Sequence, residues 1–183
     1  MAVGILGLTM ALGFSGCQSE NQKNQDAYRK IGINSMAEGD YDKAVKSFQK
    51  ALDTSLGKIG AEEIDICYYK AAAQFAKKDY DGAIETYTSL IDYDKENANA
   101  YYLRGSVYLD TDKKDKAFKD YKNAVKYAGR EYEIYEGIYE NLTNKGETEE
   151  AKNYLKKALD IKPKDGADYA EQGHVYYLSL IHI

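Results

Sequence analysis

An alanine within an apolar stretch recurs along this chain at nearly constant intervals, and this periodicity limits the possible folds more than any other feature. The alanines are Ala44, Ala83, Ala117 and Ala151. Ala117 and Ala151 each follow the preceding alanine at i+34, whereas Ala83 follows Ala44 at i+39. Such a period is typical of repeat proteins, in which each unit buries its apolar face against its neighbours. The first interval therefore holds five extra residues, which we place around residues 55–62.

The residues around each alanine predict a helix with one apolar stripe. From each of the first three alanines, apolar or aromatic residues follow at i+1, i+4, i+7 and i+8, which is one face of a 3.6-residue helix. The first repeat shows the pattern as Ala44, Val45, Phe48, Ala51 and Leu52. A second helical stretch precedes each of these helices, and three of the preceding stretches carry a small residue where the paired helices should approach closely. These small residues are Gly32, Ala71 and Gly105. The turns at 39–42 and 78–81 contain aspartates that we expect to cap the second helix.

These repeats resemble the tetratricopeptide family. The aligned segments are 27–52, 67–91, 100–125 and 134–159, and a fifth begins after Pro163, so the resemblance covers residues 26–177. It implies an all-α solenoid in which antiparallel helix pairs stack in a right-handed superhelix. Two residues depart from the family pattern: Tyr139 replaces a small residue and Arg104 replaces an apolar one. Cys67 stands where the other first helices have Tyr, and we interpret it as a core residue rather than a nucleophile.

The resemblance also implies a binding groove on the concave face, which the first helix of each repeat lines. Carried over position by position, the groove residues are Arg29, Ile33, Met36, Tyr68, Phe75, Tyr102, Ser106, Leu109, Glu136 and Glu140. Such a groove is apolar and aromatic in the first three repeats and acidic in the fourth, which suits a peptide with hydrophobic anchors and a basic end. The alternative is that the aromatic residues only fill contacts between repeats.

The N-terminus resembles a bacterial lipoprotein signal. Residues 2–14 are nearly all apolar or small, and Ser15 and Gly16 precede Cys17. The apolar run has the length of a secretory signal and is shorter than the roughly 20 residues of a membrane-spanning helix. We therefore predict a signal peptide over 1–16, a lipid on Cys17 and a polar tether over 17–25. This places the protein at the extracytoplasmic side of the cell envelope, anchored to the membrane. The alternative is a buried helix over 1–16 with an unmodified thiol.

The last six residues, 178–183, interrupt the repeat pattern. They are apolar, and a common transposase adapter sequence encodes the same six residues, so we expect an adapter-derived tail on a truncated gene. The fifth repeat is then incomplete.

Composition and motifs argue against several functions. The formal net charge is −5 without a long basic run, so nucleic acid is an unsuitable partner. The two cysteines and two histidines lack metal-site spacing, and no phosphate loop or catalytic motif is present. We therefore expect no enzyme activity, cofactor or metal. The favoured function is a membrane-anchored scaffold for a protein or peptide partner. Two alternatives stay open: a docking domain of a longer envelope enzyme, and a self-associating envelope component.

Overall fold

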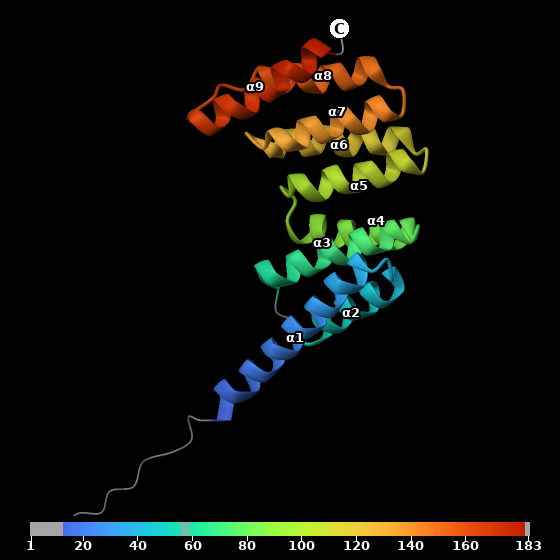
Figure 1. The fold of residues 1–183 in the computed structure, drawn as a ribbon, viewed down its shortest axis with the longest axis vertical. Helices are drawn as coiled ribbons and strands as arrows, with labels where there is room; N and C mark the ends of the chain where they lie inside the picture. Colours follow the sequence, from blue (N-terminus) through green and yellow to red (C-terminus); the bar gives the residue numbers. More distant parts are fainter. Residues whose placement is uncertain (1–12, 56, 58, 182–183) are drawn as a thin grey trace, which may run out of the picture. The chain divides into compact units, whose positions relative to one another are not determined.

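The chain folds into α-helices joined by turns, and Figure 1 shows this fold as a computed structural model. The structure describes residues 13–55, 57 and 59–181. The helices are α1 (Gly13–Ala37), α2 (Tyr41–Asp53), α3 (Ala61–Ala76), α4 (Tyr80–Tyr93), α5 (Ala98–Asp110), α6 (Lys114–Ala128), α7 (Tyr132–Asn144), α8 (Thr148–Leu159) and α9 (Gly166–Ile181). Contacts divide the chain into two compact units, 1–78 and 79–183. Unit 1 contains α1 to α3, and unit 2 contains α4 to α9. The predicted first helices are α1, α3, α5 and α7, and the second helices are α2, α4, α6 and α8.

The turn between paired helices has the same backbone geometry in every repeat. A residue with positive φ occurs at Gly39, Lys78, Asp112 and Gly146, each at the same offset before its anchoring alanine. In the first two turns an aspartate follows and caps the second helix, as predicted. The Oδ1 atom of Asp40 accepts a hydrogen bond from the Lys43 amide at 3.1 Å, and Asp79 does the same for the Gly82 amide.

The paired helices approach closely where the sequence predicts it. A Cβ atom added to Gly32 would lie 2.5 Å from the Phe48 ring, and one added to Gly105 would lie 2.8 Å from the Tyr121 ring. Both rings are fully buried. The absent side chain on the first helix therefore makes room for an aromatic ring on the second, and the prediction is confirmed for the first and third repeats.

The fourth repeat reverses this exchange of volume. In the first and third repeats the close-approach residue and its ring stand at i and i+16, and the same offset joins Tyr139 to Leu155. Both of these side chains are buried and belong to the unit 2 core. The large residue thus lies on the first helix and the smaller one on the second, so the departure seen in the sequence keeps the core filled.

Arg104, the other departure, forms a buried ion pair inside unit 2. Its Nε and Nη2 atoms donate to the two carboxylate oxygens of Asp120 on α6, at 2.7 and 2.9 Å. Its Nη1 atom donates to Thr88 on α4 at 3.0 Å. The Asp120 side chain is 4 % exposed and that of Arg104 is 15 % exposed. A bidentate pair of this kind fixes the relative orientation of the two side chains. Arg104 of α5 therefore links α4 and α6 within unit 2.

The extra residues of the first interval lengthen both the loop before α3 and the start of α3 itself. α3 begins at Ala61, six residues before Cys67, whereas α5 and α7 begin three residues before the equivalent Tyr101 and Tyr135. The start of α3 carries three acidic residues that contact α1. Gln22 donates to Glu62 at 2.6 Å, Gln25 donates to Glu63 at 2.8 Å, and Arg29 binds Asp65.

These contacts revise the predicted tether. Residues 17–25 belong to α1, and Gln25 is buried. The polar residues there are long amides and charged groups that a helix accommodates, and α3 offers carboxylates as hydrogen-bond acceptors for them. The polar composition of this segment is therefore compatible with a helix that contacts α3.

The two ends of the chain bear on the remaining predictions. Residues 1–12 and 182–183 lie outside the described residues, as do the side chains of residues 13–19, so the signal peptide and the lipid site are not described. Within the described part, none of the helices is both long and apolar enough to cross a bilayer. The last helix, α9, contains the start of the fifth repeat and runs on to residue 181, into the expected tail.

Candidate functional site

In unit 1, the predicted groove residues lie on α1 and α3. Arg29 is engaged by Asp65, and its guanidinium lies 5.4 Å from the centre of the Tyr69 ring. Ile33 and Met36 are half-buried and pack against the core around Phe48. Tyr68 and Phe75 are half-buried as well and make further contacts. Each of these side chains therefore has a structural role as well as partly exposed surface.

In unit 2, Tyr102 and Ser106 belong to a hydrogen-bond network between the first helices α5 and α7. Asn141 donates to the Ser106 hydroxyl at 2.8 Å, and the Tyr121 hydroxyl reaches it at 3.4 Å. The Ser106 hydroxyl itself donates to the Tyr102 carbonyl at 2.9 Å. Burial raises the pKa of Tyr121 to about 12, so its hydroxyl stays neutral. Ser106 has no hydrogen-bonding capacity left for a ligand.

Tyr102 lies against a glycine on the next first helix. A Cβ atom added to Gly137 would lie 2.3 Å from the Tyr102 hydroxyl oxygen. Burial also raises the pKa of Tyr102. For Tyr102 the structure therefore supports the alternative interpretation, that the aromatic side chain fills a contact between repeats. The repeat pattern carried little signal for Asn141 and Gly137. The position of Gly137 is not small in the other repeats, and Asn141 shares its residue type only with Asn34 of the first repeat.

The assignment of Leu109 to the groove needs a correction. This side chain is buried and belongs to the unit 2 core. That core also contains residues of α6, α7 and α8, so the end of α5 is enclosed at this position. Leu109 therefore offers no surface to a ligand.

The acidic residues of α7 remain accessible to different degrees. Glu140 is exposed, whereas the Glu136 side chain is 14 % exposed and accepts a hydrogen bond from His174 of α9 at 2.9 Å. Burial raises the pKa of the Glu136 carboxyl, and the hydrogen bond from His174 lowers it by less. Glu171 and Glu133 add to the rise through charge repulsion. Glu136 is thus a partly desolvated carboxylate with one neighbouring imidazole.

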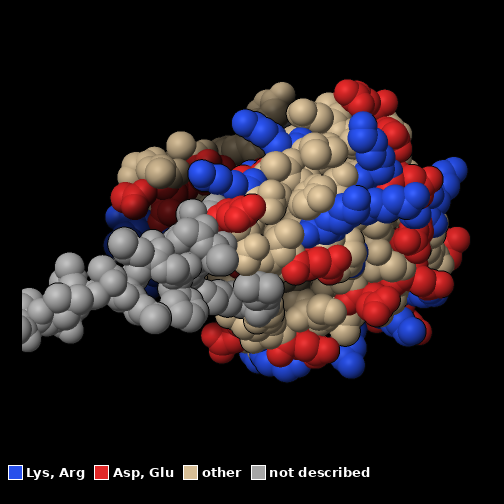
Figure 2. Space-filling model, turned by 90° about the horizontal axis from the view of Figure 1, so that it is seen from below, with Lys and Arg blue, Asp and Glu red and all other residues tan. Residues whose placement is uncertain are grey.

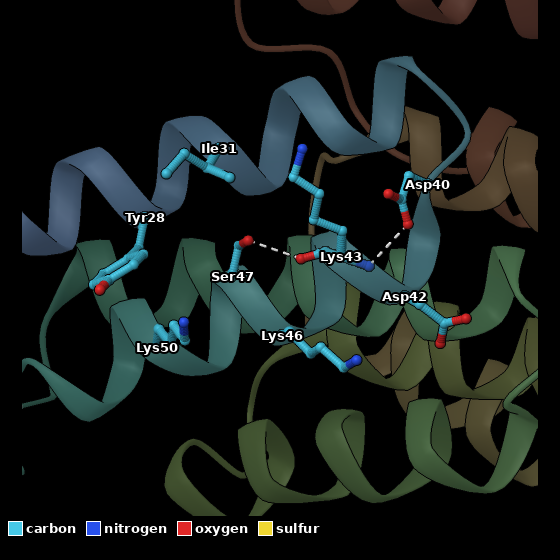
Figure 3. A pocket seen from close by; sticks show the side chains of 8 residues that line it. All are labelled: Tyr28, Ile31, Asp40, Asp42, Lys43, Lys46, Ser47 and Lys50. Carbon is cyan, nitrogen blue, oxygen red and sulfur yellow. Dashed lines mark hydrogen bonds between the residues drawn. The ribbon is translucent and has the colours of Figure 1, made fainter.

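A separate cavity of about 450 Å³ lies between α1 and α2 in unit 1, and Figure 3 shows its lining. Tyr28 and Ile31 come from α1, and Lys43, Lys46 and Lys50 come from α2 at positions i, i+3 and i+7. Lys50 lies over the Tyr28 ring, with 5.4 Å between its Nζ atom and the ring centre. The mixed charge of this cavity matches the surface drawn in Figure 2, where Lys and Arg alternate with Asp and Glu. The lining is completed by Asp40, Asp42 and Ser47.

Other chemistry is limited among the described residues. Cys67 is half-buried, and burial raises the pKa of its thiol, which disfavours the reactive thiolate. The part of the chain that the structure describes contains no group of three or more His, Cys, Asp or Glu side chains placed to hold a metal ion.

Family models decide the identity of the repeats. Models described as tetratricopeptide repeats match residues 29–87, 98–130 and 140–165, and a model described as a TPR repeat matches 71–112. Together these matches reach into all four repeats. The chain belongs to the tetratricopeptide repeat family.

Solved structures show the same fold. MamA from Desulfovibrio magneticus RS-1 superposes with a TM-score of 0.59 at 22 % identity, with 78 % of this chain and 77 % of that chain covered. TTC0263, a thermophilic TPR protein of Thermus thermophilus, gives 0.59 at 18 % identity over 86 % and 85 %. YrrB, described as a TPR protein with an unusual peptide-binding site, gives 0.54 at 18 % identity over 84 % and 74 %. No curated protein matches the sequence.

The predicted fold class, an all-α tetratricopeptide solenoid, is therefore confirmed. Repeats of this family build protein–protein interaction scaffolds, and they support that general role for this chain. The family and the fold are typically non-catalytic.

The contact between Glu136 and His174 generates a prediction on pH. We expect the Glu136 carboxyl to titrate above the ordinary value of 4.5, and His174→Gln to raise its pKa further because the imidazole hydrogen bond is lost. Glu171→Gln should lower it, since it removes a repelling charge. Because folding raises this pKa, the stabilising contribution of the group is complete below about pH 4.5 and is lost as pH rises through the folded-state pKa. Carbon-detected NMR titration measures these values, and a lower Glu136 pKa in His174→Gln would contradict the assignment.

Proposed function

We propose that the chain is a membrane-anchored scaffold that binds a peptide with hydrophobic anchors and a basic end. The binding surface is the acidic face of unit 2, which we define as Glu133, Glu136 and Glu140 of α7 together with His174 and Tyr177 of α9. The general scaffold role follows from the repeat family. The peptide and the membrane anchor are the specific parts of the proposal.

The arrangement of carboxylates on α7 carries the proposal. Glu133, Glu136 and Glu140 follow one another at i, i+3 and i+7, which is one face of the helix. Glu133 and Glu140 are exposed and form no ion pair with the residues that the structure describes. Glu136 is already partly desolvated, so a cation placed beside it interacts more strongly than one in bulk water. The face is thus suited to Lys or Arg side chains.

The hydrophobic anchor of the peptide has a partner on α9. Tyr177 is 59 % exposed and lies one turn from His174, which contacts Glu136. An exposed Tyr offers a large apolar contact with a polar tip, and such residues are enriched at protein interfaces. The net charge of −5 adds long-range attraction for a basic partner.

The membrane anchor rests on the N-terminal sequence. The apolar run, Ser15, Gly16 and Cys17 resemble a lipoprotein signal, and processing there would leave a lipid on Cys17 at the exported face of the cell envelope. α1 spans Gly13–Ala37 as one helix. A lipid on Cys17 would therefore be only about 16 Å along the helix axis from Tyr28 of the first repeat, at about 1.5 Å per residue.

Selection from a phage-displayed peptide library on the full chain tests the peptide proposal. We expect enriched peptides to combine an aromatic or aliphatic residue with Lys or Arg. Replacing Glu136 and Glu140 with Gln should weaken their binding about tenfold, because charge-assisted contacts of about 1–2 kcal/mol are lost. Glu149→Gln on α8 is the matched control and should leave affinity unchanged. Enrichment of acidic peptides, or equal loss in the control, would refute the assignment.

The anchor is tested separately by expressing the chain in bacterial cells and partitioning the cell extract between detergent and water. The unaltered chain should enter the detergent phase and lose about 16 residues from its N-terminus, as the expected cleavage predicts. Cys17→Ser should move to the aqueous phase or stay uncleaved. Cleavage and detergent partitioning that persist in Cys17→Ser would disprove lipidation at this cysteine while leaving the peptide proposal intact.

A further inference from the structure

Three lysines run along the outer side of α6. Lys119, Lys122 and Lys126 stand at i, i+3 and i+7, which is one face of a helix, and all three are exposed. The other side of α6 faces the unit 2 core, where Ala117 and Tyr121 are fully buried. The lysines therefore point away from the core. We call Lys119, Lys122 and Lys126 the basic stripe.

The basic stripe is not neutralised by the residues that the structure describes. None of its three lysines forms an ion pair with them. Lys126 instead contacts an aromatic ring: its Nζ atom donates to the Tyr127 hydroxyl at 2.9 Å and lies 4.5 Å from the ring centre. Asp120, which directly follows Lys119, is buried in its own ion pair. The stripe is thus available to carboxylates from outside.

The acidic face of unit 2 has carboxylates at the same spacing. Glu133, Glu136 and Glu140 also stand at i, i+3 and i+7. At about 1.5 Å per residue, the charges of both stripes are separated by about 4.5 and 6 Å along the helix axis. Two such helices can lie side by side in either direction, with each lysine within reach of a carboxylate.

One carboxylate shares the face of the basic stripe, and it fits this pairing. Asp115 stands one turn before Lys119 and is exposed. In an antiparallel pairing, with Lys126 beside Glu133, Asp115 lies beside Asn144 at the end of α7, and an amide can donate a hydrogen bond to a carboxylate. In a parallel pairing, Asp115 lies before the first residue of α7. Asp115 meets no carboxylate of α7 in either direction.

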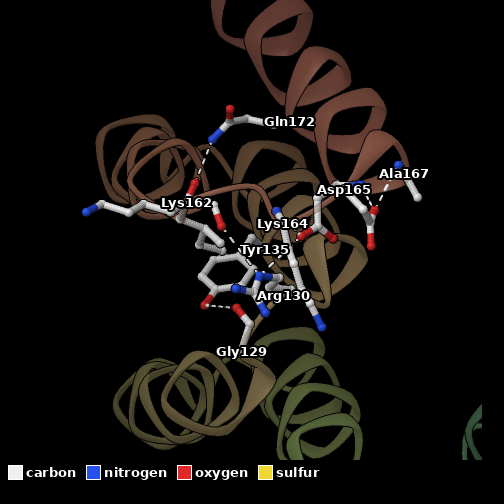
Figure 4. A network of polar contacts seen from close by, with 10 residues as sticks. Gly129, Arg130, Tyr135, Lys162, Lys164, Asp165, Ala167 and Gln172 are labelled. Atoms are coloured by element: carbon white, nitrogen blue, oxygen red, sulfur yellow. Dashed lines mark hydrogen bonds and ion pairs between the residues drawn. The ribbon is translucent and has the colours of Figure 1, made fainter.

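Within one copy, α6 and α7 are held so that the two charged surfaces do not meet. The Tyr135 hydroxyl of α7 contacts the carbonyls of Val125 and Gly129 at the end of α6, at 3.2 and 3.4 Å. Arg130, between the two helices, donates to the Lys162 carbonyl at 3.4 Å. Figure 4 shows Tyr135 beside Gly129 and Arg130 beside Lys162. The described residues of the two surfaces form no ion pair with one another, so both remain open to another molecule.

We propose that the basic stripe of one copy binds the acidic face of unit 2 on a second copy of this chain. The inference rests on the proposed function, because it assigns the basic partner of that same face. Tyr177, which borders the acidic face, gives the lysine stems an apolar surface to cover. Each copy has both surfaces, so the contact joins unlike patches head to tail and can repeat from copy to copy.

The net charge of the chain does not prevent this contact. Two copies of net charge −5 repel each other at long range. At physiological salt the Debye length is about 8 Å, so the charges that face each other across the contact dominate. Glu136 is partly desolvated, which strengthens its attraction for a lysine. The other pairs are exposed and individually weak, so association is weak and decreases as salt is added.

A second lysine series, on α2 of unit 1, supplies the matched control. Lys43, Lys46 and Lys50 have the spacing of the basic stripe and are exposed as well. Asp40 and Asp42 line the same cavity as these lysines. Carboxylates therefore flank the α2 lysines, and we expect them not to bind the acidic face.

Sedimentation velocity of the full chain over a range of concentrations tests the inference. The unaltered chain should self-associate, and high salt should weaken the association. Lys119→Glu combined with Lys122→Glu should raise the dissociation constant at least about tenfold, because like charges then face each other. Lys43→Glu combined with Lys46→Glu changes the net charge equally and should leave self-association unchanged.

Charge reversal on both surfaces separates this contact from any other cause of association. Glu133→Lys combined with Glu140→Lys should by itself prevent self-association, since both surfaces are then basic. When these two substitutions are combined with Lys119→Glu and Lys122→Glu in one chain, the charges are exchanged between the surfaces and self-association should return. A recovery in the fourfold variant cannot result from misfolding.

Several results would overturn the inference. These are a chain that stays monomeric, self-association that Lys119→Glu with Lys122→Glu leaves unchanged, an equal loss in the α2 control, and a fourfold variant that remains dissociated. A monomeric chain that still binds the basic peptides selected from the library would overturn this inference alone, and the proposed function would stand. A monomeric chain that binds no basic peptide would overturn both.

Discussion

The fold depends on the close approach of paired helices, which requires that the volume at position i of the first helix complement the volume at i+16 on the second. Gly32 with Phe48 and Gly105 with Tyr121 satisfy this requirement by a missing side chain facing a buried ring. Burying an aromatic side chain of about 150–250 Å² contributes roughly 4–6 kcal/mol at about 25 cal/mol per Å². A side chain on the glycine would push the ring out and forfeit much of that gain.

The surfaces available for binding follow from this pairing. Where a first helix has its ring in place, as α5 does, the aromatic stripe is covered and the helix offers solvent its other face. α9 has tyrosines at the positions equivalent to Tyr101 and Tyr108, and these residues, Tyr169 and Tyr176, are exposed in the structure. Among the acidic residues of α7, Glu133 and Glu140 are exposed, whereas Glu136 is partly buried beside His174. The surfaces available to a ligand are therefore those that the pairing of helices does not bury.

The sequence was sufficient for the repeats because their signal is periodic. The anchoring alanines, the capping aspartates and the close-approach glycines recur at fixed intervals, and the structure confirms each at Ala44, Asp40 and Gly105, among others. Residues that act through a single partner carried no such signal. Arg104 stood out as a departure, but its partner Asp120 could not be identified without knowing which helix faces approach each other.

The candidate site was less predictable for the same reason. Family positions assigned Leu109 to a groove, although neighbouring helices bury it. Ser106 was assigned to the same groove, but the hydrogen-bonding capacity of its hydroxyl is filled by contacts that include Asn141. The segment 17–25 was expected to be a polar tether, and the structure shows that Gln22 and Gln25 within it bind carboxylates at the start of α3. Side-chain contacts between helices, rather than composition, decided each case.

The complementarity claim is tested most directly in the fourth repeat, by a double-mutant cycle on Tyr139 and Leu155 read out by urea unfolding. Tyr139→Ala alone should cost about 3–5 kcal/mol and Leu155→Tyr alone about 1–3 kcal/mol. The double variant recreates the residue types that the second repeat has at the equivalent positions, Ala71 and Tyr87. It should be at least about 1 kcal/mol more stable than the sum of the single effects predicts. Strict additivity of the two substitutions would contradict the account, because it would mean that the two positions do not share one volume.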